Sequence, residues 1–137
     1  MINRLSVVLL LSSLALPVRA EKDSFKVMHV ADLSAALNSP KPPTVCDANT
    51  KDVRKKAGVI PGAILLTSSS KFNVAKELPA DKSTALVFYC ANTQCMASHG
   101  AADRAKRAGY KNISVLVDGI LGWKEAGQPT TPVSKLR

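Results

Sequence analysis

Short apolar runs alternate with amphipathic helical patterns along most of the chain. Runs bounded by turn residues are typical of buried strands, and apolar positions three or four apart are typical of helices. Five runs fit the strand pattern: 25–30, 44–46, 63–66, 85–89 and 113–117. Because helical patterns separate these runs, the chain favours an α/β fold with a mostly parallel sheet flanked by helices.

Start and stop residues help to place the helices. Asp32 is expected to cap a helix over 33–38. A longer helix is predicted over 97–108, with Gly109 in the left-handed position that often ends a helix. Residues 67–82 show no clear period and are expected to hold one helical turn within a loop.

The first twenty residues have a different character. Arg4 supplies a positive charge, 5–16 is apolar apart from three serines, and Val18-Arg19-Ala20 offers small or apolar residues at a cleavage point. We predict a signal peptide over residues 1–20, and therefore an exported protein, periplasmic or secreted. The alternative is an uncleaved membrane anchor, because Arg19 is unusual in a cleavage motif. The apolar run, about 12 residues, is shorter than the roughly 20 that span a bilayer.

The rest of the chain is long enough for one compact core. We predict a single domain over 24–133 and a frayed tail over 134–137. Loss of the leader lowers the formal net charge from +9 to +7. Much of that charge lies in two clusters, Lys51-Arg54-Lys55-Lys56 and Arg104-Lys106-Arg107-Lys111. No aromatic residues interleave with these cations, so we interpret them as solvated helix faces and expect no nucleic acid partner.

The chain has three cysteines, Cys46, Cys90 and Cys95. An odd number in an exported protein leaves at least one thiol without an intramolecular disulfide partner. Cys46 lies within a predicted strand and is expected to be a core residue. Cys90 follows the clearest strand, 85–89, and so lies at the carboxyl edge of the sheet, where open α/β folds place their ligands.

Cys90 opens a short polar loop that leads into the predicted helix. The loop consists of Ala91, Asn92, Thr93, Gln94 and Cys95, and Ser98 is expected to help cap the helix. Such a loop can direct backbone N–H groups at the Cys90 sulfur, and the positive end of the helix dipole also favours a thiolate. The same donors would stabilise a persulfide anion, Cys–S–S⁻. We therefore predict that Cys90 is the reactive sulfur; the alternative is an inert core cysteine.

Several motifs occur in register along the chain. Cys90 and its loop are followed by Ala108-Gly109-Tyr110 and by Asp118-Gly119-x-x-x-Trp123, and they are preceded by Cys46-Asp47-Ala48 and Gly58-Val59-Ile60-Pro61-Gly62-Ala63. Together these motifs resemble the rhodanese-like (sulfurtransferase) domain family over essentially the whole predicted domain. The resemblance implies a five-stranded parallel sheet with helices on both faces.

The resemblance also implies the transfer of sulfane sulfur through a persulfide on Cys90. The expected partners are a small sulfur donor and a thiol or cyanide acceptor, and a protein thiol would also serve. No cofactor is expected. Asp47 and Trp123 match family positions that we expect to shape the site rather than to react. Contact with a membrane is expected only if the leader is retained.

The chain departs from the family pattern at its cationic positions. Loop residues 91–94 include no arginine or lysine, and Cys95 stands where an arginine often ends the loop. Asn49 replaces the arginine after the strand-end aspartate, and Val59 replaces the usual histidine. Without a guanidinium to clamp an oxyanion, thiosulfate is disfavoured as the donor. Phosphatase chemistry is disfavoured for the same reason.

Cys95 opens a second functional possibility. As a resolving thiol it could attack a Cys90 persulfide, release sulfide and leave a disulfide. The two thiols could instead cycle as a redox couple, or Cys95 could simply pack inward. The alternative function is therefore a non-enzymatic rhodanese-like module that binds a partner or reports redox state through Cys90 and Cys95. His99 adds a third potential metal ligand, but without a Cys-x2-Cys pair we expect no metal site.

Overall fold

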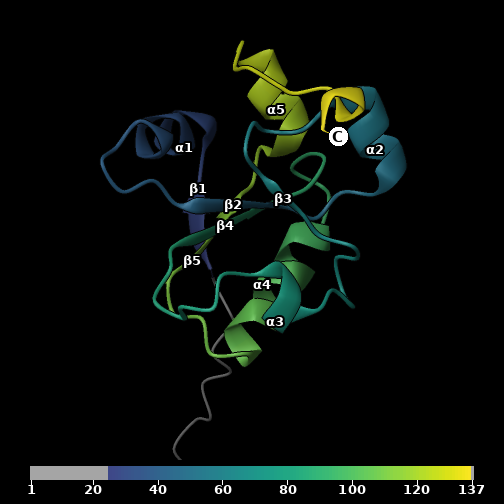
Figure 1. The fold of residues 1–137 in the computed structure, drawn as a ribbon. Coiled ribbons are helices and arrows are strands. Elements are labelled where there is room, and N and C mark those ends of the chain that lie inside the picture. The colour runs from purple at the N-terminus through teal and green to yellow at the C-terminus, as the bar shows by residue number, and fades with distance from the viewer. Residues whose placement is uncertain (1–24, 137) are drawn as a thin grey trace, which may run out of the picture.

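The computed structural model of the chain describes residues 25–136 and contains one five-stranded sheet (Figure 1). All strand pairs are parallel, and the strand order is β1-β5-β4-β2-β3. The strands are β1 (Lys26–Met28), β2 (Thr44–Asp47), β3 (Ile64–Leu65), β4 (Leu86–Tyr89) and β5 (Ile113–Leu116). The predicted five-stranded α/β fold is confirmed, whereas the predicted signal peptide, residues 1–20, lies outside the described residues.

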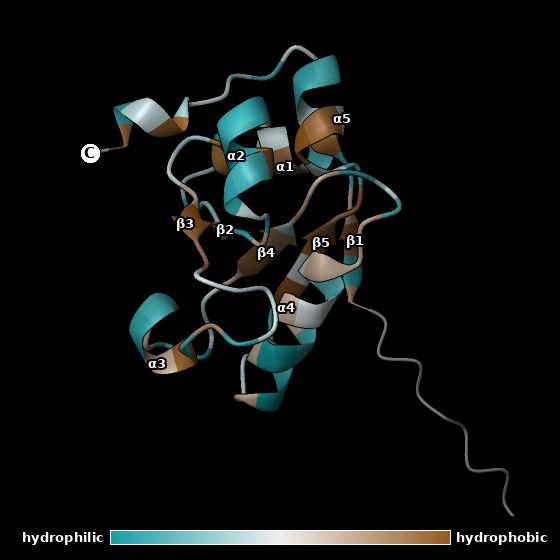
Figure 2. Cartoon of the chain, turned by 90° about the vertical axis from the view of Figure 1, so that its right-hand side faces the viewer, coloured by the Kyte–Doolittle hydropathy of each residue, from teal (hydrophilic) through white to brown (hydrophobic). Residues whose placement is uncertain are grey.

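Helices cover both faces of this sheet. They are α1 (Val30–Leu37), α2 (Lys51–Ala57), α3 (Val74–Glu77), α4 (Ala97–Arg107) and α5 (Gly119–Glu125). Figures 1 and 2 show α1, α2 and α5 on one side and α3 and α4 on the other. No helix within residues 25–136 is long and apolar enough to cross a membrane.

The core consists of two apolar clusters, one on each face of the sheet. Strand β4 contributes to both, because Leu86 and Phe88 pack toward α4 whereas Val87 and Tyr89 pack toward α1, α2 and α5. All four side chains are buried, as expected of a central parallel strand. Figure 2 shows apolar strands β4 and β5 beneath the polar surface of α2.

Side chains fix the starts of the first two helices. Helix α1 begins three residues earlier than predicted, with His29 at its N-cap, and Asp32 accepts a hydrogen bond from the His29 N–H at 3.0 Å. Asp32 is therefore not the N-cap residue. It lies in the first turn of the helix, where its carboxylate satisfies a backbone N–H that has no partner within the helix. Thr50 caps α2, accepting from the Val53 N–H at 3.3 Å.

The segment after α5 lies against the domain. The Trp123 Nε1–H donates to the Pro129 carbonyl oxygen at 2.8 Å, and Thr131 forms an antiparallel bridge with Val59. Val133–Lys135, which overlap the predicted tail, form a short 3-10 helix. Backbone hydrogen bonds between Thr131 and Val59 hold this segment against the domain. The polarity of its side chains in the sequence does not reveal such a contact.

Candidate active site

Cys90 follows the middle strand of the sheet directly. The backbone just before it is held on the β2 side, where the Ala48 N–H donates to the Tyr89 carbonyl oxygen at 2.9 Å. The residue is 2% exposed. The carboxyl ends of all five strands lie at this edge, so the loops that follow them surround the Cys90 position.

The loop after Cys90 folds back on itself and brings two cysteines together. The Asn92 carbonyl oxygen accepts a hydrogen bond from the Cys95 N–H at 3.2 Å, and the Asn92 side-chain oxygen accepts one from the Gln94 N–H at 3.0 Å. Asparagine favours such turns because its side chain can bond to the backbone two residues on. Cys90 and Cys95, whose Cα atoms are 6.3 Å apart, form a disulfide.

This arrangement differs from the predicted convergence of loop N–H groups on the Cys90 sulfur. Two of those groups, from Gln94 and Cys95, are directed at Asn92. A disulfide sulfur carries no charge, so it attracts N–H donors less than an amide oxygen does. The Cys90 Sγ instead lies 3.2 Å from the Cys95 carbonyl oxygen and 3.3 Å from the Ser98 Oγ.

Ser98 was not anticipated at the sulfur, because the sequence suggested a capping role. Met96 is the N-cap of α4, and Ser98 lies within the first turn with its side chain directed inward. It is 2% exposed. Ser98, Ala101, Ala102 and Ala105 are the buried residues of α4, spaced as one helix face. That spacing of small residues was the available signal that Ser98 faces the sheet.

Helix α5 holds the Cys90 loop from the opposite side. The Ile120 N–H donates to the Cys90 carbonyl oxygen at 2.9 Å, and the Leu121 N–H donates to that of Ala91 at 3.0 Å. These first-turn N–H groups have no acceptor within their own helix. Gly119 has φ +64°, and a Cβ there would lie 2.5 Å from the Ala91 carbonyl carbon and oxygen. The glycine of the Asp-Gly motif therefore permits close contact between helix and loop.

A hollow of about 710 Å³ lies beside the loop. Asp118 borders it and accepts hydrogen bonds from the Val30 N–H at 2.9 Å and from His29 Nδ1 at 3.1 Å. The residues that line the hollow are His29, Val30, Ala31, Asn92, Thr93, Asp118, Leu121, Gly122, Glu125, Ala126 and Gln128. This lining includes two carboxylates and neither lysine nor arginine, so it offers no strong site for a dianion.

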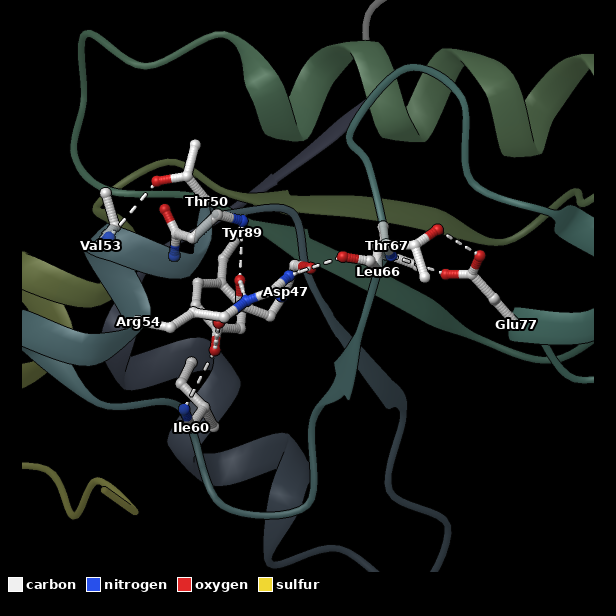
Figure 3. A network of polar contacts seen from close by, with 10 residues as sticks. Asp47, Thr50, Val53, Arg54, Ile60, Leu66, Thr67, Glu77 and Tyr89 are labelled. Atoms are coloured by element: carbon white, nitrogen blue, oxygen red, sulfur yellow. Dashed lines mark hydrogen bonds and ion pairs between the residues drawn. The ribbon is translucent and has the colours of Figure 1, made fainter. Parts of the chain in front are cut away.

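A buried polar network lies at the end of β2 (Figure 3). Asp47 is fully buried and accepts hydrogen bonds from Arg54 Nε at 3.0 Å, the Tyr89 hydroxyl at 2.5 Å and the Asn49 N–H at 2.7 Å. Arg54 Nη2 also donates to the Asp47 and Leu66 carbonyl oxygens, both at 2.9 Å. The network joins β2, β4, α2 and the end of β3.

The prediction that the basic residues of α2 form a solvated face is wrong for Arg54. Lys51, Lys55 and Lys56 are exposed, but Arg54 is buried against Asp47. Arg54 and Ala57 lie on one helix face, three positions apart, and this face packs toward the sheet. A buried carboxylate needs a partner, and Arg54 provides it from α2.

Burial sets the protonation of two groups near this network. Desolvation, with a smaller effect from the negative charge of Asp47, raises the pKa of the Cys46 thiol to about 12. Desolvation also raises the pKa of Tyr89, and the Asp47 charge and hydrogen bond add to the effect. Both groups are therefore neutral at physiological pH. Cys46 lies in the core cluster that faces α4 and is the free cysteine.

The other candidate residues have packing roles. Trp123 is buried in the core cluster on the α1, α2 and α5 side. Among the described residues, no group of three or more His, Cys, Asp or Glu side chains is placed to hold a metal ion. His99, weighed as a ligand beside Cys90 and Cys95, is partly buried on α4.

Solved structures from several bacteria share this fold. The BH2092 protein from Bacillus halodurans has a TM-score of 0.67 at 23% identity, with 79% of this chain and 77% of that chain covered. The rhodanese-like domain of the Alr3790 protein from Anabaena has a TM-score of 0.65 at 22% identity, with 83% and 84% covered. No curated protein is detectably similar to the chain in sequence.

A thiosulfate sulfurtransferase from Pseudomonas aeruginosa also contains the fold. Its TM-score is 0.64 at 23% identity over 78% of this chain, but the match spans only 20% of that larger protein. Likeness at this identity shows a common fold. Sequence membership comes from the family model of the rhodanese-like domain, which matches residues 29–126. The chain therefore belongs to the rhodanese-like domain family.

Proposed function

We propose that the protein is a sulfurtransferase that carries sulfane sulfur as a persulfide on Cys90. The supporting observation is the place of the Cys90 sulfur, which lies at the carboxyl edge of the middle strand, against Ser98 and the first turn of α4. The N-terminus of a helix favours an anionic sulfur. The name of the Pseudomonas aeruginosa relative agrees with this chemistry.

The proposed reaction has two steps that balance without a net oxidant. The reduced Cys90 thiolate attacks the outer sulfur of a donor R–S–S⁻, forming Cys90–S–S⁻ and releasing R–S⁻. A thiolate or cyanide acceptor then attacks the outer sulfur of the Cys90 persulfide. The bond between the two sulfurs breaks, the acceptor leaves with the sulfur, and the Cys90 thiolate is restored. Before the first step, a dithiol must reduce the Cys90–Cys95 disulfide to two thiols by exchange, and the dithiol is itself oxidised to a disulfide.

We propose an organic persulfide, R–S–S⁻, whose reacting group carries a single negative charge, as the donor in preference to thiosulfate. The hollow beside the loop contains Asp118 and Glu125 and no lysine or arginine. Arg54, the buried cation at the end of β2, is already paired with Asp47. A dianionic donor in this hollow would therefore meet two carboxylates without a compensating guanidinium.

Intact-mass spectrometry of the reduced protein tests this function. Incubation with an organic persulfide should add the mass of one sulfur atom, peptide mapping should place it on Cys90, and cyanide should remove it as thiocyanate. A Cys90→Ser protein is the matched control and should take up no sulfur. Sulfur uptake by the Cys90→Ser protein equal to that of the wild type would rule the proposal out.

The Cys90–Cys95 disulfide supports a second candidate, a thiol-redox module. In that case the reduced protein would lose two hydrogens on treatment with an oxidised dithiol and would take up no sulfur from an organic persulfide. If both sulfur uptake and the loss of two hydrogens are observed, the result would indicate the resolving role of Cys95. Cys95 would attack the Cys90 persulfide, form the disulfide and release HS⁻, and a reducing dithiol would be needed for the next cycle.

We further propose that the protein is exported to the periplasm or secreted. The support is the leader pattern of residues 1–20, with its charged start, apolar run and small residues before Glu21. Expression of the full chain in a bacterium, followed by N-terminal sequencing of the product, tests this. A product beginning at Glu21 is expected, and a chain that keeps Met1 and pellets with membranes would indicate an anchor.

A further inference from the structure

We propose that Ser98 donates a hydrogen bond to the Cys90 sulfur and stabilises its anionic forms. The inference rests on the proposed function, since it assigns a role in sulfur transfer to a second side chain. Ser98 stands eight residues after Cys90, outside the loop that the sequence singled out.

The contact is buried and specific. The Ser98 Oγ lies 3.3 Å from the Cys90 Sγ, and each residue is 2% exposed. A buried hydroxyl is costly to leave without a hydrogen-bond partner, and the sulfur supplies one. Ser98 is the second residue of the eleven-residue helix α4, so the donor and the helix N-terminus reach the sulfur from one side.

The other polar neighbour of the sulfur has the opposite effect. The Cys95 carbonyl oxygen, 3.2 Å from the Cys90 Sγ, can accept a hydrogen bond from a thiol but repels a thiolate. In the reduced protein the Cys90 S–H can donate to that oxygen while the Ser98 O–H donates to the sulfur. When the thiol loses its proton, only the Ser98 contact becomes stronger. Ser98 thus offsets the effect of the Cys95 carbonyl group.

Several other groups of the loop cannot fulfil this role. Residues 91–95 carry no cationic side chain, and the N–H groups of Gln94 and Cys95 are used by Asn92. In the second step of the proposed transfer, the Cys90 sulfur is the leaving group. A leaving thiol of lower pKa departs faster, so a donor at this sulfur accelerates release to the acceptor.

The test is the pH dependence of Cys90 alkylation in the phosphine-reduced protein, followed by peptide mapping so that each cysteine is scored separately. The Ser98→Ala substitution should shift the alkylation midpoint of Cys90 upward by about one pH unit. Because a less acidic thiol gives a more nucleophilic thiolate, the rate well below the midpoint should fall only about threefold. Ser98→Thr keeps the hydroxyl and should retain the wild-type midpoint.

Two comparisons keep the test decisive. Ser98→Val has the shape of Ser98→Thr without the hydroxyl, so the pair separates hydrogen bonding from packing even if Ser98→Ala folds poorly. Ser114→Ala removes a buried hydroxyl on β5, away from the loop, and should not move the midpoint. Equal midpoints for the threonine and valine variants would overturn the proposal. This readout needs no sulfur donor, so it fails or succeeds separately from sulfur uptake by the wild type.

Discussion

Arg54 and Asp47 form a buried ion pair between α2 and the end of β2, and both belong to the network that supports this edge of the sheet. Removing the cation would leave a carboxylate fully buried without its charge partner. We expect Arg54→Leu to lower the free energy of unfolding by about 3 kcal/mol. Lys55→Leu, at the exposed neighbouring position, should change it by less than about 0.5 kcal/mol. Urea unfolding measures both, and equal effects would contradict this role for Arg54.

Cys46 should be far less reactive than Cys90 and Cys95. Burial raises the pKa of Cys46 to about 12, so this thiol stays almost entirely protonated at pH 8. After reduction, iodoacetamide at pH 8 should label Cys90 and Cys95 and leave Cys46 unmodified. The same treatment in guanidinium chloride should label all three cysteines. Labelling of Cys46 in the folded protein at the rate of the other two would show that it is not a core residue.

Gly119 determines how closely α5 approaches the Cys90 loop. A Cβ at Gly119 would clash with the Ala91 backbone at 2.5 Å, whereas a Cβ at Gly127, at the similar φ of +76°, would meet no atom within 4 Å. Both alanine variants carry the cost of a positive φ, about 1 kcal/mol. We expect Gly119→Ala to lower the melting temperature more than Gly127→Ala and to slow disulfide formation, because the loop must move. Identical melting temperatures would argue against this contact.

Periodicity predicted the elements near the site well. The strand expected over 85–89 is β4, and the helix expected over 97–108 is α4, because each has a uniform period and a clear boundary residue. Residues 67–82 had no such period. There the Glu77 carboxylate accepts hydrogen bonds from the Thr67 N–H, the Thr67 hydroxyl and the Asn73 N–H, which fix the loop before α3. Side-chain to backbone contacts of this kind leave no repeating pattern in a sequence.

The candidate site was predicted in part for related reasons. The sequence motif and the strand order correctly placed Cys90 at the carboxyl edge of the sheet. In a parallel sheet the C-terminal ends of all strands lie at the same edge, and Cys90 directly follows a strand. The roles of Ser98 and Arg54 depend on which way one helical residue faces. In the sequence Ser98 lies among alanines and Arg54 lies among lysines. Hydropathy therefore did not show that Ser98 faces the sheet instead of capping the helix, or that Arg54 is buried instead of solvated.

The molecule as a whole should lose stability in alkaline solution. Cys46 and Tyr89 have raised pKa values in the fold, against ordinary values of 9.0 and 10.0. The unfolded chain therefore releases protons above pH 9 that the folded chain retains, so stability is full below about pH 9 and declines as pH rises toward the folded pKa values. Urea midpoints from pH 7 to 10.5 should show this decline, with a shallower slope for Cys46→Ala. A midpoint that stays constant to pH 10.5 would contradict it.

The parallel order of all five strands has a practical consequence for orientation. Every strand enters the sheet at one edge and leaves at the other, and the Cys90 loop lies where β4 leaves. Strand β1 begins at Lys26, so a group attached just before Phe25 lies at the opposite end of the strands from Cys90. A bead, electrode or fusion partner linked at that end would present the sulfur loop outward to macromolecular thiols in the surrounding solution.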